Sequence, residues 1–394
     1  MRWESFHIIL SLGAIIGRKI RQFDIKSAYL HGIMREEVWV QQPEGFEVPS
    51  KDNLALLLQN ALYGTKQGGN ESQKTLYEFM RTLEWIFSNY NVAVFFKLWN
   101  DNTWAIIGVW VDDATSTRME SRLLELEDAV MNRFSISSEG EAHWILGTNI
   151  HHDAESHLVS ISQRDYIENL AVKFNIQNAK PIKSPIPLGI NFSAINPPST
   201  EEEKKDTENL PYRKLIGSLM FAAMVSCPDI AYSVNKLAQY FSNPCPAHWN
   251  LTKRVLQYLY SMKDQVLRLG GENLCLHAYS DADFAGDSNG RHPTGGYAIF
   301  LGARPISWSS RKQSVVALSS TKSEYIVLSE VTREIMWTRH FFEEIDIMYE
   351  VFRSHKCFCC SSGVLISYMH VYICCLLCSV HMIGSVSFLV SVVL

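Results

Sequence analysis

The order of apolar and polar residues predicts a chain in which short strands alternate with helices. Residues 5–20 predict a helix, and RQFDIKSAYL after them predicts a strand leading into a turn and a second helix. The apolar run WAIIGVWVDD is β-rich and ends abruptly in two acids, whereas SRLLELEDAVMNRFSI has its apolar residues at helical spacing. The alternating segment EEVWVQQPEGF predicts a short hairpin, and ILGTNIHHD and HLVSISQ predict two more strands.

A polar run in the middle of the chain, NPPSTEEEKKDTENLP, has no periodicity and predicts a surface linker or long loop. A helical block follows, from YRKLIGSLMFAAMV through HWNLTKRVLQYLYSM. From Leu274 the pattern changes to three short strands, LHAYSDADF, GGYAIFLG and PISWSS, closed by the helix TKSEYIVLSEVTREIMWTRHFFEEI. Strands and helices in this order predict an α+β protein with more than one domain.

Composition adds two limits to this picture. With 394 residues the chain is long enough for two or three domains, and 47% hydrophobic with 20% charged residues is typical of a globular protein. The net charge of −5 gives no global basic field. A protein of this kind that binds nucleic acid must therefore gather its Lys and Arg residues locally.

The final 38 residues differ from the rest, because they contain no Asp, Glu, Lys or Arg and hold six of the nine cysteines. The few cysteines elsewhere suit a reducing compartment. Length and apolarity permit a membrane helix around Tyr372–Leu394, but scattered Ser, His and Cys favour a translated intron or a shifted frame. Membrane association of this tail is therefore not expected.

Three carboxylates are candidates for phosphoryl-transfer chemistry. Two-metal catalysis needs acids that converge from separate strands, so that the ions stabilise both the attacking and the leaving oxygen. Asp24 ends the RQFD strand, and Asp112 and Asp113 follow the strand IIGVWV, where a hairpin tip would expose them. Two acids at a turn are usually only solvated, so this pair alone is weak evidence.

The neighbouring motifs strengthen the case. FDIKSAYLHG, EEVWVQQPEGF, ALYGTKQ and WVDD occur in this order, followed by WILGTNI, SQRDYIENL and KSPIP. The set resembles the reverse transcriptase of copia-type LTR retrotransposon Pol polyproteins. The resemblance implies an antiparallel palm in which Asp24, Asp112 and Asp113 bind Mg²⁺ (or Mn²⁺). It also implies that Tyr29 faces the sugar of the incoming nucleotide and that Gln67 lies along the nucleotide pocket. Two alternatives stay open: Tyr29 could be an aromatic residue packed in the core, and Gln67 could be a polar residue at the surface.

The resemblance continues into the second half of the chain. CPDI and HWNLTKRVLQYL resemble the family's helical thumb and connection, and YSDADFAGDSNGRHPTGGYAIFLG onward resembles its ribonuclease H domain. Asp281 and Glu324 match the first two metal-binding acids of that domain, whereas Asp283 and Asp287 are expected to be turn residues. DADFAGDSNGRH also resembles an EF-hand loop, but His292 at its twelfth position makes calcium ligation improbable.

Several departures from the family pattern bear on activity. The chain starts about twenty residues before Asp24, so the fingers and their basic residues are expected to be missing. LYGTKQGGNESQ lacks the family's Pro-Arg and the Trp that follows, and Trp110 replaces the usual Tyr before V-D-D. The ribonuclease H match stops near Ile345. Two carboxylates are too few for a two-metal site, so ribonuclease H activity is predicted to be lost.

The sequence thus predicts four regions: 1–188, reverse transcriptase palm and start of the thumb; 189–271, linker and helical connection; 272–349, a partial ribonuclease H-like α/β domain; and 350–394, a Cys-rich tail whose last 38 residues are uncharged. The implied function is that of an RNA-directed DNA polymerase, degenerate or inactive, acting on an RNA/DNA primer-template and dNTPs. A non-catalytic nucleic-acid-binding remnant is the alternative. No obligate protein partner can be inferred. The expected location is cytoplasmic, with a virus-like particle or the nucleus as alternatives.

Overall fold

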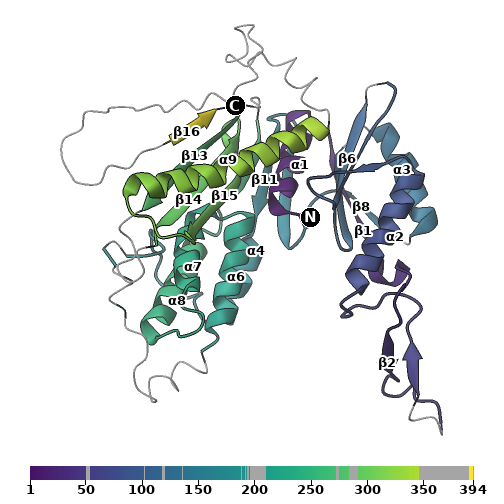
Figure 1. Cartoon of the computed structure of the whole chain (residues 1–394), viewed down its shortest axis with the longest axis horizontal. Helices are drawn as coiled ribbons and strands as arrows, with labels where there is room; N and C mark the ends of the chain where they lie inside the picture. Colours follow the sequence, from purple (N-terminus) through teal and green to yellow (C-terminus); the bar gives the residue numbers. More distant parts are fainter. Residues whose placement is uncertain are drawn as a thin grey trace. The chain divides into compact units, whose positions relative to one another are not determined.

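The computed structural model of the chain (Figure 1) describes residues 1–49, 54–101, 103–117, 120–134, 136–187, 189–190, 192, 195, 210–271, 275–283, 292–345 and 390–393. It divides into two compact units, Met1–Leu146 and Gly147–Leu394. Each unit mixes helices with antiparallel sheet, which confirms the predicted α+β class. The two units are described separately below.

The first unit is built on a six-stranded sheet. Its strand order is β4-β5-β6-β7-β1-β8, and neighbouring strands pair antiparallel throughout. The strands are β4 (Ile86–Phe87), β5 (Val94–Leu98), β6 (Trp104–Trp110), β7 (Asp113–Thr117), β1 (Ile20–Ile25) and β8 (Ile136–Glu141). The apolar run before the two acids thus becomes β6, and the acids lie where it turns into β7.

One face of this sheet is covered by α2 (Gly68–Thr82) and α3 (Glu120–Arg133). Alternate residues of the strands, such as Phe23 and Ile107, share a buried cluster with Met80 of α2 and Val130 of α3. This cluster is the hydrophobic core of the unit, as period-two alternation in the strands requires.

Helix α1 (Trp3–Ile15) is part of the core of this unit, because Ser5–Ala14 are buried on every side. It packs against strands β1, β6 and β7. A Cβ at Gly13 would lie 2.8 Å from Ile20 Cγ1 and 2.9 Å from Thr117 Oγ1, two residues that pair across β1 and β7. The absence of a side chain at Gly13 therefore sets how closely the helix approaches the sheet.

A small two-stranded sheet, β2 (Trp39–Gln41) with β3 (Ala55–Leu57), follows the 3₁₀ turn η1 (Ala28–His31). In the register of this pair, Val40 lies opposite Leu56. The predicted hairpin within EEVWVQQPEGF is therefore too short, because its strand finds its partner after Pro43 and Gly45, at residues 55–57.

The second unit begins with the strands β10 (Thr148–Asp153) and β11 (Leu158–Ser162), which β12 (Leu267–Gly270) joins; β9 (Trp144–Ile145) precedes them. The helices between β11 and β12 contribute to one buried cluster, which includes Leu170, Leu219, Val234 and Leu256. They are α4 (Arg164–Lys173), α6 (Tyr212–Val225), η3 (Pro228–Ile230), α7 (Ala231–Ala238) and α8 (Pro246–Ser261).

The same unit contains a second sheet of order β15-β14-β13-β16. The strands are β13 (Leu276–Asp283), β14 (Thr294–Leu301), β15 (Arg304–Lys312) and β16 (Val390–Val393), and α9 (Ser320–Glu344) packs against β13 and β14. A Cβ at Gly295 would lie 2.3 Å from Val327 Cγ2, so this glycine permits the close approach of α9. The indole nitrogen of Trp308 donates to the Ala223 carbonyl of α6 at 2.7 Å.

Most of the uncharged tail lies outside the described residues, and so does Asp287. The part of the tail that the structure describes is β16, which pairs antiparallel with β13. No helix among the described residues is both long enough and apolar enough to span a membrane.

Candidate active site

The turn between β6 and β7 carries two of the predicted acids. Trp110 pairs with Asp113, which leaves Val111 and Asp112 as the two residues of the turn. Val111 has φ 58°, a left-handed conformation that a β-branched residue adopts only under strain of about 1–3 kcal/mol. Strain of this kind is common in functional loops, and here the flanking strands hold it in place.

The third predicted acid lies beside this turn. Asp24 pairs directly with Asp113 across β1 and β7, and the amide of Ile25 donates to the carbonyl oxygen of Asp112 at 2.8 Å. Gln22, two residues before Asp24 on β1, places its amide nitrogen 3.5 Å from Asp113 Oδ1. The backbone register therefore brings the three acids to the same end of two neighbouring strands.

The carboxylate of Asp112 is held by a residue that the sequence analysis did not single out. The Tyr63 hydroxyl lies 3.1 Å from Asp112 Oδ1 and 3.2 Å from Oδ2, so it donates to this carboxylate. Partial burial and this hydrogen bond raise the pKa of Tyr63. Tyr63 lies in the motif ALYGTKQ, which the sequence comparison did highlight. No spacing rule, however, connects this tyrosine with Asp112, which lies far along the chain.

Tyr29 lies on the other side of Tyr63. The two ring centroids are 4.4 Å apart and the rings are inclined by 34°. Tyr29 is half-buried and belongs to the 3₁₀ turn η1, directly after β1. It therefore reaches the turn at Asp112 through a second aromatic ring.

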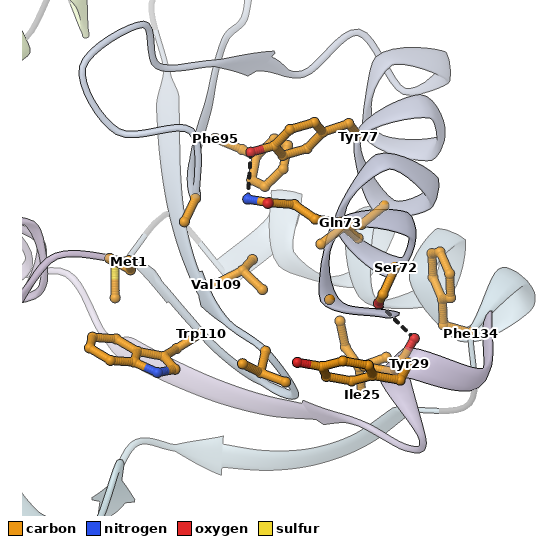
Figure 2. Close-up of a pocket in the computed structure, with 15 residues that line it drawn as sticks. Met1, Ile25, Tyr29, Ser72, Gln73, Tyr77, Phe95, Val109, Trp110 and Phe134 are labelled. Carbon is orange, nitrogen blue, oxygen red and sulfur yellow. Dashed lines mark hydrogen bonds between the residues drawn. The ribbon is translucent and has the colours of Figure 1, made fainter. Parts of the chain in front are cut away.

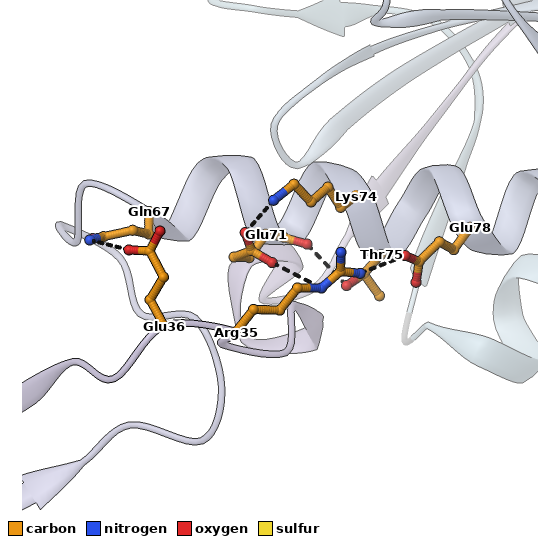
Figure 3. Close-up of polar contacts among 7 residues, drawn as sticks. All are labelled: Arg35, Glu36, Gln67, Glu71, Lys74, Thr75 and Glu78. Carbon is orange, nitrogen blue, oxygen red and sulfur yellow. Dashed lines mark hydrogen bonds and ion pairs between the residues drawn. The ribbon is translucent and has the colours of Figure 1, made fainter.

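Gln67 has a different set of partners (Figure 3). Its amide nitrogen donates to Glu36 Oε2 at 3.0 Å. Four residues further along, Glu71 is buried and forms ion pairs with Lys74 at 2.6 Å and Arg35 at 3.4 Å. This polar cluster ties the start of α2 to the segment before β2, so Gln67 serves here as a structural contact.

The chemical type of Asp24, Asp112 and Asp113 suits a divalent cation, because carboxylate oxygens are the ligands that Mg²⁺ prefers. Their side chains do not converge on one point. Within the described residues, no three His, Cys, Asp or Glu side chains form a group that could hold a metal. Asp112 is turned toward Tyr63. Holding a cation between the three acids therefore requires Asp112 to exchange the Tyr63 hydroxyl for it.

A second pair of acids lies in the other unit. The amide of Ala282 donates to Asp281 Oδ1 at 2.9 Å and to Glu324 Oε1 at 3.3 Å, so β13 and α9 bring these two carboxylates together. Burial, and after it the charge of Asp281, raise the pKa of Glu324 to about 7. The Glu324 Oε2 atom is buried and has no hydrogen-bond partner among the residues that the structure describes. Asp283 ends the same strand.

Comparison with known proteins decides the family. The model of the reverse transcriptase (RNA-dependent DNA polymerase) domain matches residues 1–188. The chain is 34% identical over 348 residues to the retrovirus-related Pol polyprotein from transposon TNT 1-94 of Nicotiana tabacum, an alignment that covers 88% of this chain and 26% of that protein. This chain belongs to the copia-type retrotransposon Pol family.

Two further Pol proteins of Arabidopsis thaliana, from transposons RE2 and RE1, are each 34% identical to the chain. Each alignment covers 87% of this chain and 23% of the relative. The chain thus spans about a quarter of the length of the curated Pol relatives it matches. The predicted family membership is confirmed, and the similarity extends well beyond the reverse transcriptase domain into the second unit.

Proposed function

We propose that this chain is the RNA-directed DNA polymerase portion of a retrotransposon Pol polyprotein, extending a primer on an RNA or DNA template with dNTPs. The pairing of Asp24 with Asp113 beside the strained turn that carries Asp112 is the observation that supports this proposal most strongly. Acids on neighbouring strand ends are one way to build a site for nucleotidyl transfer.

In this proposal Asp24, Asp112 and Asp113 hold Mg²⁺ or Mn²⁺. The bound cations would neutralise the charge that develops on the transferred phosphoryl group. Asp24 and Asp113 are already opposite each other in the ladder, and Asp112 joins them by leaving Tyr63. The ring of Tyr29, supported by Tyr63, packs against the sugar of the incoming nucleotide.

Two observations favour weak polymerase activity. The hydroxyl of Tyr63 competes with a cation for Asp112, and the amide of Gln67 is already engaged by Glu36. Among the described residues of the ribonuclease H-like segment, the two acids Asp281 and Glu324 lie together where a two-metal site needs more, so no ribonuclease H activity is proposed. We place the protein in the cytoplasm, in keeping with its sparse cysteines outside the tail.

Primer extension tests the polymerase proposal. The chain is incubated with an RNA template, a DNA primer, dNTPs and Mg²⁺ or Mn²⁺, in parallel with Asp112→Asn and with Asp128→Asn, a control at an exposed position of α3. Incorporation is expected from the wild type and from the control, and not from Asp112→Asn. Equal incorporation by the wild type and Asp112→Asn would contradict the proposal.

The internal hydrogen bonds of Asp112 and Gln67 also favour a second candidate function, a non-catalytic nucleic-acid-binding protein. Fluorescence anisotropy with a labelled primer-template separates the two. Binding that weakens steeply with salt, together with no incorporation under any metal, would favour the second function.

A further inference from the structure

A pocket of about 320 Å³ lies within the first unit, beside the turn that carries Asp112 (Figure 2). One wall is the first half of α2, with Ser72 and Gln73, and the other is formed by β5, β6 and Val111. Tyr29 and Phe134 close the end opposite Phe95 and Tyr77 in the view of Figure 2. Its volume is at the lower limit for small-molecule sites.

No side chain that lines the pocket is charged; Met1 also carries the N-terminal ammonium, whose pKa is lowered by burial. None of the fifteen described residues that line it has an Asp, Glu, Lys, Arg or His side chain. Placing a phosphate or carboxylate in such surroundings would remove its water, and no lining side chain would give it a counter-charge, at a large cost in free energy. The pocket is therefore unsuited to the triphosphate of a nucleotide and suited to a neutral molecule.

Five of the fifteen described residues that line the pocket are aromatic. Tyr29, Tyr77, Phe95, Trp110 and Phe134 all line the pocket, and ring faces and edges favour a flat, aromatic partner. An apolar cavity of about 150 Å³ accepts benzene, so a pocket of about twice that size has room for two fused rings.

Three polar side chains at the wall are already paired. Gln73 Nε2 donates to the Tyr77 hydroxyl at 2.7 Å, the Tyr77 hydroxyl donates to the Val92 carbonyl, and Ser72 Oγ donates to the Ala28 carbonyl at 2.8 Å. Burial raises the pKa of Tyr77 to about 12, in agreement with apolar surroundings at that end. The Tyr29 hydroxyl points along the pocket toward Trp110 (Figure 2) and has no hydrogen-bond partner among the described residues.

We infer that this pocket is a binding site for a small, neutral, planar aromatic molecule of one or two fused rings, whose polar edge hydrogen-bonds to Tyr29. The side chain of Ser72 is small and leaves the pocket open. Ser72 lies in LYGTKQGGNESQ, the stretch that lacks the Trp of the family pattern. The site is separate from the carboxylates, and its occupancy needs neither metal nor nucleotide. Val111 and Trp110 belong both to the pocket wall and to the turn that carries Asp112.

Isothermal titration calorimetry of the full chain with indole tests this inference, in the absence of metal and nucleotide. A dissociation constant of about 0.1–1 mM is expected for so small a ligand. Ser72→Trp places an indole ring in the pocket and should weaken binding by about tenfold or more, since the volume is then filled. Asn70→Trp, at an exposed position of the same helix, is the matched control and should leave the affinity within about twofold.

Ala93→Phe fills the pocket from the side of β5 and serves where Ser72→Trp does not fold. Indole-3-acetate, which adds a carboxylate, should bind more weakly than indole. The inference is overturned by an absence of indole binding, by unchanged affinity in a folded filling variant, or by equal affinity for indole-3-acetate. Because the titration involves no polymerisation, its failure and the failure of the polymerase proposal are independent results.

Discussion

The two clusters of acidic residues in this protein lie in different surroundings. In the first unit the acids lie at strand ends, partly exposed to water, and a neutral phenol donates to Asp112. In the second unit Glu324 lies beside another acid, and one of its oxygens is buried without a hydrogen-bond partner in the described part of the chain. Burial and the charge of Asp281 raise the pKa of Glu324 and so favour its protonated form. Two clusters built from similar residues thus differ in their exposure to water and in their hydrogen-bond partners.

The largest expected effect separates the two groups by function. Asp24→Asn should reduce nucleotide incorporation by about 100-fold or more, because it removes a charged ligand from the proposed metal site. Asp281→Asn should leave incorporation unchanged within about twofold, since it lies in the other unit. Single-turnover primer extension measures both. Equal losses would mean that the two groups do not differ in the way proposed.

The second prediction concerns stability against pH. Since the pKa of Glu324 rises from 4.5 to about 7 on folding, the folded state binds a proton more tightly than the unfolded state. This contribution is fully present below pH 4.5 and is lost as the pH rises through about 7. Glu324→Gln should flatten that loss, which we expect to be about 1–2 kcal/mol because water screens the partly exposed side chain.

Urea unfolding at several pH values between 4.5 and 8 measures the effect, with Glu330→Gln on the same helix as control. The wild type and the control should lose stability relative to Glu324→Gln across this window. Parallel curves for all three proteins would show that Glu324 does not carry the effect.

The smallest expected effect tests how Tyr63 holds Asp112. Tyr63→Phe removes the hydroxyl, so a cation no longer has to displace it, and Mn²⁺ affinity should rise by about two- to tenfold, as for the loss of one exposed hydrogen bond to a charge. Electron paramagnetic resonance of free Mn²⁺ measures the affinity without any reaction. Tyr325→Phe, at an exposed position of α9, should change nothing. Weaker Mn²⁺ binding by Tyr63→Phe would make the hydroxyl a supporting group instead of a competitor.

The elements were predictable from the sequence where apolar periodicity was strong. The strand before Asp112 and the helix after Ser319 lie where the pattern predicted them, because burial of one face imposes the pattern. The partner of β2 was predicted too close, since strand pairing across a loop depends on tertiary packing. Helix α1 needs a glycine at position 13 because the helix lies close to β1 and β7 there. This contact joins distant segments, so the local sequence pattern does not predict it.

The site was predictable only as a set of residues. The motifs predicted that Asp24, Asp112 and Asp113 act together, and the register of β1 with β7 brings them to one end of the sheet. The hydrogen bond from Tyr63 to Asp112 depends on side-chain orientation across distant segments, which sequence spacing does not encode. The link from Gln67 to Glu36 was missed for the same reason.

The strand order of the first sheet has a consequence for motion. Strands β1 and β7 are interior strands, whereas β4 and β8 form the edges. Interior strands open only in the largest fluctuations of a sheet, and edges open in small ones. Amide hydrogens of residues 114–117 should therefore exchange with solvent far more slowly than those of β4. The acids thus lie on the part of the unit that keeps its geometry longest, while the edges of the sheet open and close many times.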